Sequence, residues 1–376
     1  MKDDAFAPWM LKVDETRKIF MGLLLAAAFV TLHPALLAAR PVSPVIGIYN
    51  GLFSTASGVT EQTAGMLRGL TVRQNGTYSG TILINGRSHV ISGTFDGMDQ
   101  ATNPIALGTG QGGPLLVEMT LSNASNAPPQ VTGMVSGNTN GVPWAANLIA
   151  DFATNSLSAA EYTMLIPPCT NNAPPDSSPG GDGYALIAND AGTIRITGAL
   201  ADGTAFNQTA SVSQDGYVPI YANLYSRKGL LLGWINLGST NTGGVSLTWI
   251  HPERGSGLYR TGFTNVLFTN QILLSAWTNP EATIDLLSNL TVLDTINDTN
   301  ALINFTVSIN DNFNFDDVSD PQLLRGSINL GTGRWKVIIG VRASKLTGYG
   351  AILPNETNGG GFYLTKTNAQ AIKIGP

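Results

Sequence analysis

Residues 76–97 read GTYSGTILINGRSHVISGTFDG, and this stretch shows a local pattern that recurs along the chain. Apolar and polar side chains alternate on each side of Asn85-Gly86, which is the two-residue period of a strand with one buried face. Asn-Gly between two such runs is a strong hairpin signal, because both central residues of a type I′ turn need a positive φ. We therefore predict two strands joined by a tight turn.

Similar segments lie on both sides of this hairpin. They have the length of a strand, are bounded by Gly, Pro, Asn and Ser, and occupy residues 45–53, 64–76, 114–122, 130–138 and 144–152. Short strands at this close spacing are typical of a barrel or sandwich built from antiparallel hairpins.

A second series of strand-like segments follows the first. The segment GTIRITGALADG (192–203) shares with the opening stretch a leading Gly-Thr, the alternation and a closing turn, and we interpret it as the mark of an internal duplication. The predicted fold is all-β, with two related antiparallel β-barrel-like or sandwich domains built from meanders of hairpins. We place the first domain at 40–156 and the second at 157–376, and expect the strands between 302 and 366 to complete the second.

The N-terminal segment has the pattern of a secretion signal. A polar lead ending in two basic residues precedes the apolar run IFMGLLLAAAFVTL, and a proline and several small residues follow. This order is typical of a signal peptide, so we expect residues 1–39 to be removed by cleavage near Ala38 or Ala39. An uncleaved membrane anchor is the alternative, since residues 19–39 are long enough to cross a bilayer.

The composition narrows the class of protein. Of the 376 residues only 12% are charged, and the 43 Gly and 20 Pro are typical of a β-protein rich in turns. The formal net charge of −5 leaves no basic field, so we exclude nucleic acid as a partner. The single cysteine, Cys169, cannot form an internal disulfide.

Several phrases, taken as a series, resemble a known type of domain. They are the opening hairpin, GDGYALIANDAGTIRITGALADGT, GWINL with GVSLTWI, YRTGFTN, and GYGAIL with GGGFYL. The series resembles a glycine-rich β-domain of secreted and surface repeat proteins of environmental bacteria, and the resemblance covers residues 45–376. It implies a secreted or surface-associated β-protein and brings no catalytic residues to carry over. No appended repeat module or C-terminal anchor is evident, which leaves attachment to the cell open.

The histidines are the first candidates for catalysis. His89 shares its strand parity with Ile91 and Phe95, so we expect a side chain packed in the core. His251 lies in a turn close to Glu253, where a general base could stand, but no GxSxG or HExxH motif accompanies it. We expect a non-enzymatic protein. A pair of glycosidase carboxylates stays open, because their spacing is spatial and not visible in sequence.

One segment superficially resembles a calcium loop. In INDNFNFDD (309–317), side chains with oxygen atoms alternate with Phe, but the glycine turn and the distal Glu of such a loop are missing. The calcium candidates are Asp311, Asp316 and Asp317, and an acidic turn after an alternating strand is the alternative. We expect no other cofactor.

Tryptophan side chains are the remaining candidates for ligand binding. In a secreted β-protein an exposed Trp stacks on sugar rings, whereas a buried one fills the core. We name Trp144 and Trp335 as the stacking candidates. Trp234 and Trp249 have strongly apolar neighbours in sequence, so we predict that they belong to the core.

These observations lead to one expected function and two alternatives. We expect an exported β-protein, secreted or held at the cell surface or in the periplasm, that serves as a surface, matrix or binding component. Its expected partners are extracellular polysaccharide or other surface proteins. The alternatives are a carbohydrate-binding or carbohydrate-active secreted protein, and an outer-membrane β-barrel, for which clear aromatic girdles are missing. In each case we expect functional residues on the loops and open ends of the β-units.

Overall fold

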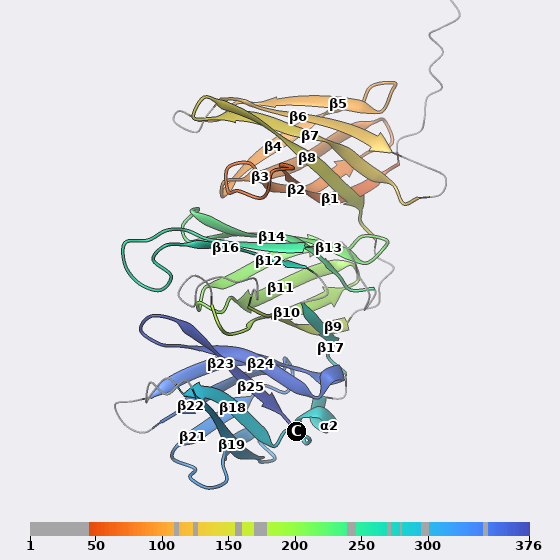
Figure 1. Ribbon diagram of the computed structural model, residues 1–376. Helices are drawn as coiled ribbons and strands as arrows, with labels where there is room; N and C mark the ends of the chain where they lie inside the picture. Colours follow the sequence, from red (N-terminus) through yellow and green to blue (C-terminus); the bar gives the residue numbers. More distant parts are fainter. Residues whose placement is uncertain are drawn as a thin grey trace, which may run out of the picture. The chain divides into compact units, whose positions relative to one another are not determined.

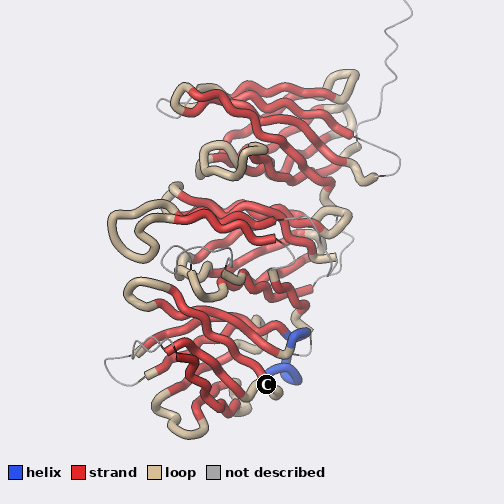
Figure 2. The backbone as a smooth tube through the Cα atoms, viewed as in Figure 1, coloured by secondary structure: helices blue, strands red, loops and turns tan. Residues whose placement is uncertain are grey.

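The computed structural model is built almost entirely of antiparallel strands (Figure 1). It describes residues 45–108, 113–122, 127–154, 160–168, 179–238, 246–268, 272–278, 280–294, 301–340 and 345–376. Within these ranges the helical structure is limited to α2 (Pro280–Ile284) and the 3-10 turn η3 (Pro354–Glu356), as Figure 2 shows in blue for α2. No helix in these ranges has the length and apolar character needed to cross a membrane. The predicted signal peptide, its cleavage site and Cys169 lie outside the described residues.

The first eight strands form one antiparallel sheet that curls into a barrel. Its order is β4-β3-β2-β1-β8-β7-β6-β5, so that the first and last strands of the segment pair with each other. The strands at the two ends of this order, β4 and β5, are joined by a turn and contact each other. The strands are β1 (Gly47–Ser54), β2 (Gly65–Val72), β3 (Thr77–Ile84), β4 (Arg87–Thr94), β5 (Gln100–Ile105), β6 (Leu115–Ser122), β7 (Gln130–Thr139) and β8 (Val142–Phe152).

The hairpin predicted from the opening stretch is confirmed. Strands β3 and β4 pair along their whole length. Asn85 and Gly86 between them have φ values of 48° and 62°, the positive pair that defines a type I′ turn. Tyr78, Ile82 and Ile84 are all buried, as the alternation predicts.

Strand β5 was not among the strands predicted from the sequence. The strand contains Pro104, and a proline argues against a central strand because it has no N–H to donate. The strand is tolerated here because it lies at the end of the sheet order, where it pairs only with β6.

The next nine strands form two sheets that share one apolar core. The order is β12-β11-β10-β9-β17 in one sheet and β13-β14-β15-β16 in the other. Ile187 and Ile196 from the first sheet belong to the same buried cluster as Leu231 and Leu247 from the second, which makes this part a sandwich. The strands are β9 (Ala160–Ile166), β10 (Gly183–Asp190), β11 (Thr193–Ala199), β12 (Ala205–Ser211), β13 (Tyr217–Leu224), β14 (Gly229–Asn236), β15 (Ser246–His251), β16 (Phe263–Phe268) and β17 (Leu273–Ala276).

The last eight strands close a barrel of their own. Strand β18 pairs with β25, and Phe315, Trp335 and Tyr363 are among the side chains that fill the interior. These strands are β18 (Asn289–Asp294), β19 (Ala301–Ile309), β20 (Asn314–Asp317), β21 (Leu324–Ile328), β22 (Arg334–Ile339), β23 (Leu346–Leu353), β24 (Asn358–Leu364) and β25 (Ala369–Gly375).

The predicted fold class, all-β with two antiparallel barrel-like domains, is confirmed by these sheets. One expectation within it is wrong, because the strands after 302 do not complete a barrel begun earlier. Together with β18 they close a separate sheet, which shares no paired strand with β9–β17. A closed sheet has no free edge to offer to other strands. The domain limits at 156 and 157 stay a prediction, since residues 155–159 lie outside the described part of the chain.

The turn between β7 and β8 allows a direct test of whether glycine is needed there for its positive φ. Gly141 has φ +84°, and a Cβ atom placed on it meets no atom within 4 Å. Backbone strain alone therefore decides the outcome, and Gly141→Ala should cost about 1–2 kcal/mol of stability. The measurement is the denaturant midpoint of the purified protein.

The matched control is Gly97→Ala. A Cβ atom at Gly97 also meets open space, but the φ of Gly97 lies outside the left-handed region. This variant should be neutral or slightly stabilising, because alanine restricts the unfolded chain. Equal midpoints for the two variants would contradict the assigned turn.

Candidate functional site

A cavity opens at one end of the barrel formed by β1–β8. In an antiparallel meander the connections that follow odd-numbered strands all lie at the same end. The cavity of about 470 Å³ is lined from each of these four connections: by Gln62 after β1, Asn85 after β3, Leu107 after β5 and Asn140 after β7. Residues distant in sequence thus meet at the open end of a β-unit. This is where we expected functional residues to lie.

Two Asn-Gly turns shape the rim of this cavity. Asn140 and Gly141 have φ values of 53° and 84°, so this turn repeats the type I′ geometry of the turn at Asn85. The side-chain oxygen of Asn138 accepts a hydrogen bond of 2.8 Å from the backbone N–H of Gly141. This bond ties the end of β7 to the turn and fixes the amide-bearing side of the rim.

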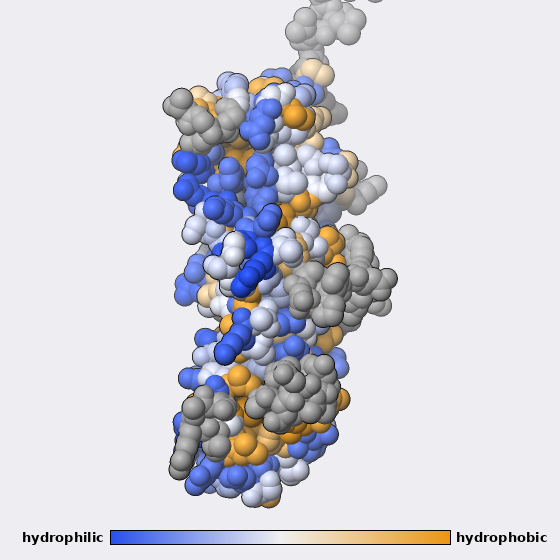
Figure 3. All heavy atoms as spheres, turned by 60° about the vertical axis from the view of Figure 1, so that its left-hand side comes forward, coloured by the Kyte–Doolittle hydropathy of each residue, from blue (hydrophilic) through white to orange (hydrophobic). Residues whose placement is uncertain are grey.

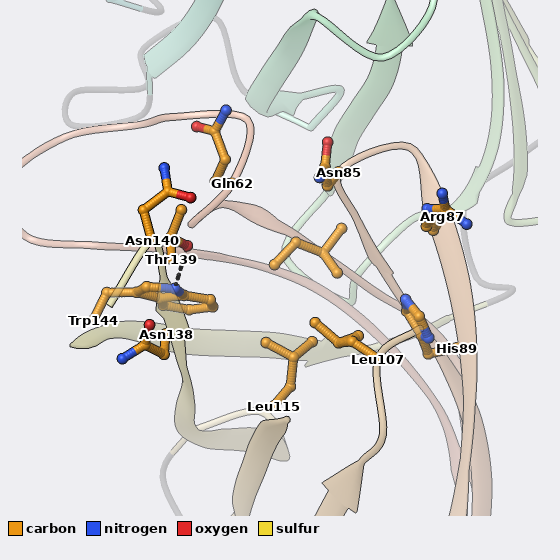
Figure 4. Close-up of a pocket in the computed structure, with 11 residues that line it drawn as sticks. Gln62, Asn85, Arg87, His89, Leu107, Leu115, Asn138, Thr139, Asn140 and Trp144 are labelled. Atoms are coloured by element: carbon orange, nitrogen blue, oxygen red, sulfur yellow. Dashed lines mark hydrogen bonds between the residues drawn. The ribbon is translucent and has the colours of Figure 1, made fainter. Parts of the chain in front are cut away.

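Trp144 forms one wall of the cavity. Its Nε1–H donates a hydrogen bond of 3.0 Å to Oγ1 of Thr139, drawn as the dashed line in Figure 4. Its ring lies close over Gly137 on the paired strand β7, where a Cβ atom would come within 2.8 Å of the indole. The indole is half-buried. The glycine and the hydrogen bond hold it in place while part of the ring stays open to the cavity.

The floor of the cavity and the wall across from Trp144 carry different kinds of side chain. Leu107 and Leu115 lie between the two walls, and His89 and Arg87 face Trp144 across the cavity (Figure 4). The wall at β4 therefore carries positive and titratable groups, the floor is apolar, and the wall at β8 is aromatic.

His89 is not the packed core residue that the sequence predicted. It has the inward parity of Ile91, but it is only half-buried, because it stands near the end of β4 where the interior opens into the cavity. Burial lowers the pKa of His89, and the nearby Arg87 guanidinium lowers it further.

The cavity as a whole combines an aromatic surface, an apolar floor and neutral amides. Amide side chains both donate and accept hydrogen bonds, so they suit a ligand rich in hydroxyl groups. On the face shown in Figure 3, hydrophilic side chains gather over the sheet of β1–β8 in the upper part of the view. The chemistry fits a small polar ligand with one apolar face.

His251 lies elsewhere, in a buried polar network of the sandwich. Its side chain is 2% exposed, and its Nε2 atom is 3.7 Å from the carboxylate of Asp202. The Nδ1–H group donates to the carbonyl oxygen of Pro252 at 2.8 Å. The Tyr225 hydroxyl donates to Asp202 at 2.6 Å and accepts from Nε1 of Trp249 at 2.9 Å. A ring buried this deeply does not meet a substrate, so its geometry is that of a structural network and not of a general base.

The three calcium candidates do not form one set of ligands. Asp311 is exposed in the turn before β20, and Asp316 accepts a hydrogen bond of 3.2 Å from Ser308 Oγ. Asp317 is buried and accepts the backbone N–H of Asp320 at 3.0 Å, so that it stabilises the following turn. Among the described residues no group of three or more His, Cys, Asp and Glu side chains is placed to hold a metal ion.

The two stacking candidates have different positions. Trp144 lines the cavity, whereas Trp335 is 2% exposed inside the closed barrel and has no surface to offer to a sugar ring. Trp335 is therefore wrong as a candidate, because its strand β22 turns it inward together with Val337 and Ile339. Trp249 is buried as predicted, and Trp234 is half-buried against the same core.

Sequence reasoning missed most residues of the cavity. The amides at Gln62, Asn85, Asn138 and Asn140, and the charged Arg87, were not named as candidates. The two Asn-Gly dipeptides were the available signal, because each marks a hairpin end, and hairpin ends meet at the mouth of a barrel.

No family model, curated protein or solved structure matches the chain significantly.

The buried network predicts a pH dependence of stability. Burial lowers the pKa of His251 more than the Asp202 carboxylate raises it, and Arg254 lowers it further. Below the ordinary histidine value of about 6.5 the unfolded chain binds a proton that the folded protein does not. Stability should therefore fall as the pH drops below about 6.5. The measurement is the denaturant midpoint at pH 7.5 and pH 5.5, and the loss should be smaller in His251→Asn.

His89→Asn is the control for this effect. His89 is less buried than His251, so its removal should leave most of the acid-induced loss in place. The same acid-induced loss in His251→Asn and the unchanged protein would show that His251 is not the group responsible.

Proposed function

We propose that this protein is an exported, non-enzymatic binding component that holds a carbohydrate in the mouth of its first barrel. One observation carries the proposal. The indole of Trp144 is half-open to a cavity and held by a hydrogen bond to Thr139, and the same cavity carries neutral amides and an apolar floor. The N-terminal sequence, typical of an export signal, supports a location where polysaccharide is present.

The chemistry of a sugar ring matches the two kinds of surface in the cavity. A pyranose has an apolar face of C–H groups, and that face loses contact with water when it packs on an aromatic ring. Its hydroxyl groups both donate and accept, as do the amides of Asn85 and Asn140. The cavity volume of about 470 Å³ lies within the range of small-molecule sites, about 300–1,000 Å³.

Binding is a better proposal than cleavage for this cavity. Glycoside hydrolysis generally uses two carboxyl groups beside the bond that breaks. None of the described residues that line the cavity is Asp or Glu. The side chains present can position and hold a saccharide, and the proposed role is therefore retention at a surface or in a matrix.

A glycan array with the purified protein, run with and without calcium, tests the proposal. We expect binding to a defined set of saccharides, and Trp144→Ala should lower the affinity for them about tenfold or more, as for a central Trp of a binding site. Trp144→Phe keeps an aromatic face and should retain most of the binding.

Val142→Ala is the matched control for this array. Val142 lies two residues from Trp144 on β8, is 65% exposed and does not line the cavity. It should bind as the unchanged protein does. A silent array, or equal binding by Trp144→Ala and the unchanged protein, would overturn carbohydrate binding at this cavity and favour a purely structural surface role.

A further inference from the structure

The cavity carries positive charge and, among its described lining, no negative charge. Arg87 is the permanently charged residue among the lining side chains, and His89 is the titratable one. The chain as a whole has a net charge of −5, so this local excess is opposite in sign to the rest of the protein. A ligand in this cavity therefore lies beside a permanent positive charge.

Arg87 has no acidic partner within the described part of the chain. The ion pairs there join His251 to Asp202 and Lys373 to Asp182. Arg87 is the first residue of β4, directly opposite Ile84 on β3. It shares the inward parity of Ile84 but is exposed, because the barrel ends there. Its guanidinium therefore stands at the cavity mouth and is not neutralised by a carboxylate of the described residues.

The charge and the aromatic wall together define a class of ligand. A guanidinium group presents donors in a planar fork that matches a carboxylate or a sulfate, and such charge-assisted bonds are stronger than bonds to neutral hydroxyl groups. We propose that the carbohydrate held in this cavity is anionic, with a sugar face on Trp144 and its acidic group on Arg87. This inference rests on the proposed carbohydrate binding and names the substrate class of the same site.

Binding of matched polysaccharides tests the inference. The probes are polygalacturonate and its fully methyl-esterified form, and dextran sulfate and dextran, so that the members of each pair share a sugar backbone and one of them carries the acidic groups. We expect at least one acidic form to bind about tenfold more tightly than its neutral partner, since a bond to a charged group is worth more than one to a neutral group. The first pair reports on carboxylates and the second on sulfates.

Two arginine variants separate a specific site from general attraction to polyanions. Arg87→Gln should lower the affinity for the acidic form about tenfold and leave the affinity for the neutral form unchanged. Arg73→Gln removes the same charge from the turn between β2 and β3, at the opposite end of the barrel, and should have no effect.

Two other outcomes would overturn the anionic ligand, and a third would overturn carbohydrate binding itself. Equal affinities for the acidic and neutral forms, with the loss in Trp144→Ala retained, would overturn the anionic ligand and leave carbohydrate binding intact. Equal losses in Arg87→Gln and Arg73→Gln would show nonspecific attraction and also overturn it. No binding to any of the four polysaccharides, together with a silent glycan array, would overturn the proposed function itself.

Discussion

Pairing between the first and last strands of an antiparallel meander sets the arrangement of both barrels. In the first barrel β1 pairs with β2 on one side and with β8 on the other, so backbone hydrogen bonds join the two ends of the segment. In a closed or nearly closed sheet the side chains alternate between the interior and the surface. The same closure brings the connections after the odd strands to one end, and for that reason Gln62, Asn85, Leu107 and Asn140 line one cavity.

The strands and turns could be predicted because their signals are local. The alternation around Tyr78 and the dipeptide Asn85-Gly86 are enough to place a hairpin and to name its buried face. The pairing of β18 with β25 could not be predicted in this way, since it joins strands about eighty residues apart. For His89 the strand parity predicted from the sequence is correct, but the predicted burial is wrong. Its burial depends on where the barrel ends, and strands distant in sequence determine that position.

The candidate site was predicted in part, and the two tryptophans show why. Trp144 follows an Asn-Gly turn, and that position at a hairpin end places it at the mouth of the barrel. Trp335 has the same strand parity as Val337 and Ile339, a local pattern that was sufficient to assign it to the interior. The charged side chains also differ, in whether a partner of opposite charge or a hydrogen-bonding group lies beside them. The buried carboxylates of Asp182 and Asp202 have cationic or hydrogen-bonding partners, whereas Arg87 stands at the cavity without an acidic partner among the described residues.

If carbohydrate binds in this cavity, Trp144 contacts the ligand, and fluorine NMR can detect that contact. Protein labelled with 5-fluorotryptophan gives a resonance for each tryptophan, and Trp144→Phe identifies the one that belongs to Trp144. During titration with a polygalacturonate oligomer the resonance of Trp144 should shift with saturation, while that of the buried Trp335 stays in place. A bound oligomer that leaves the Trp144 resonance unmoved and shifts another one would show that the ligand binds elsewhere on the protein.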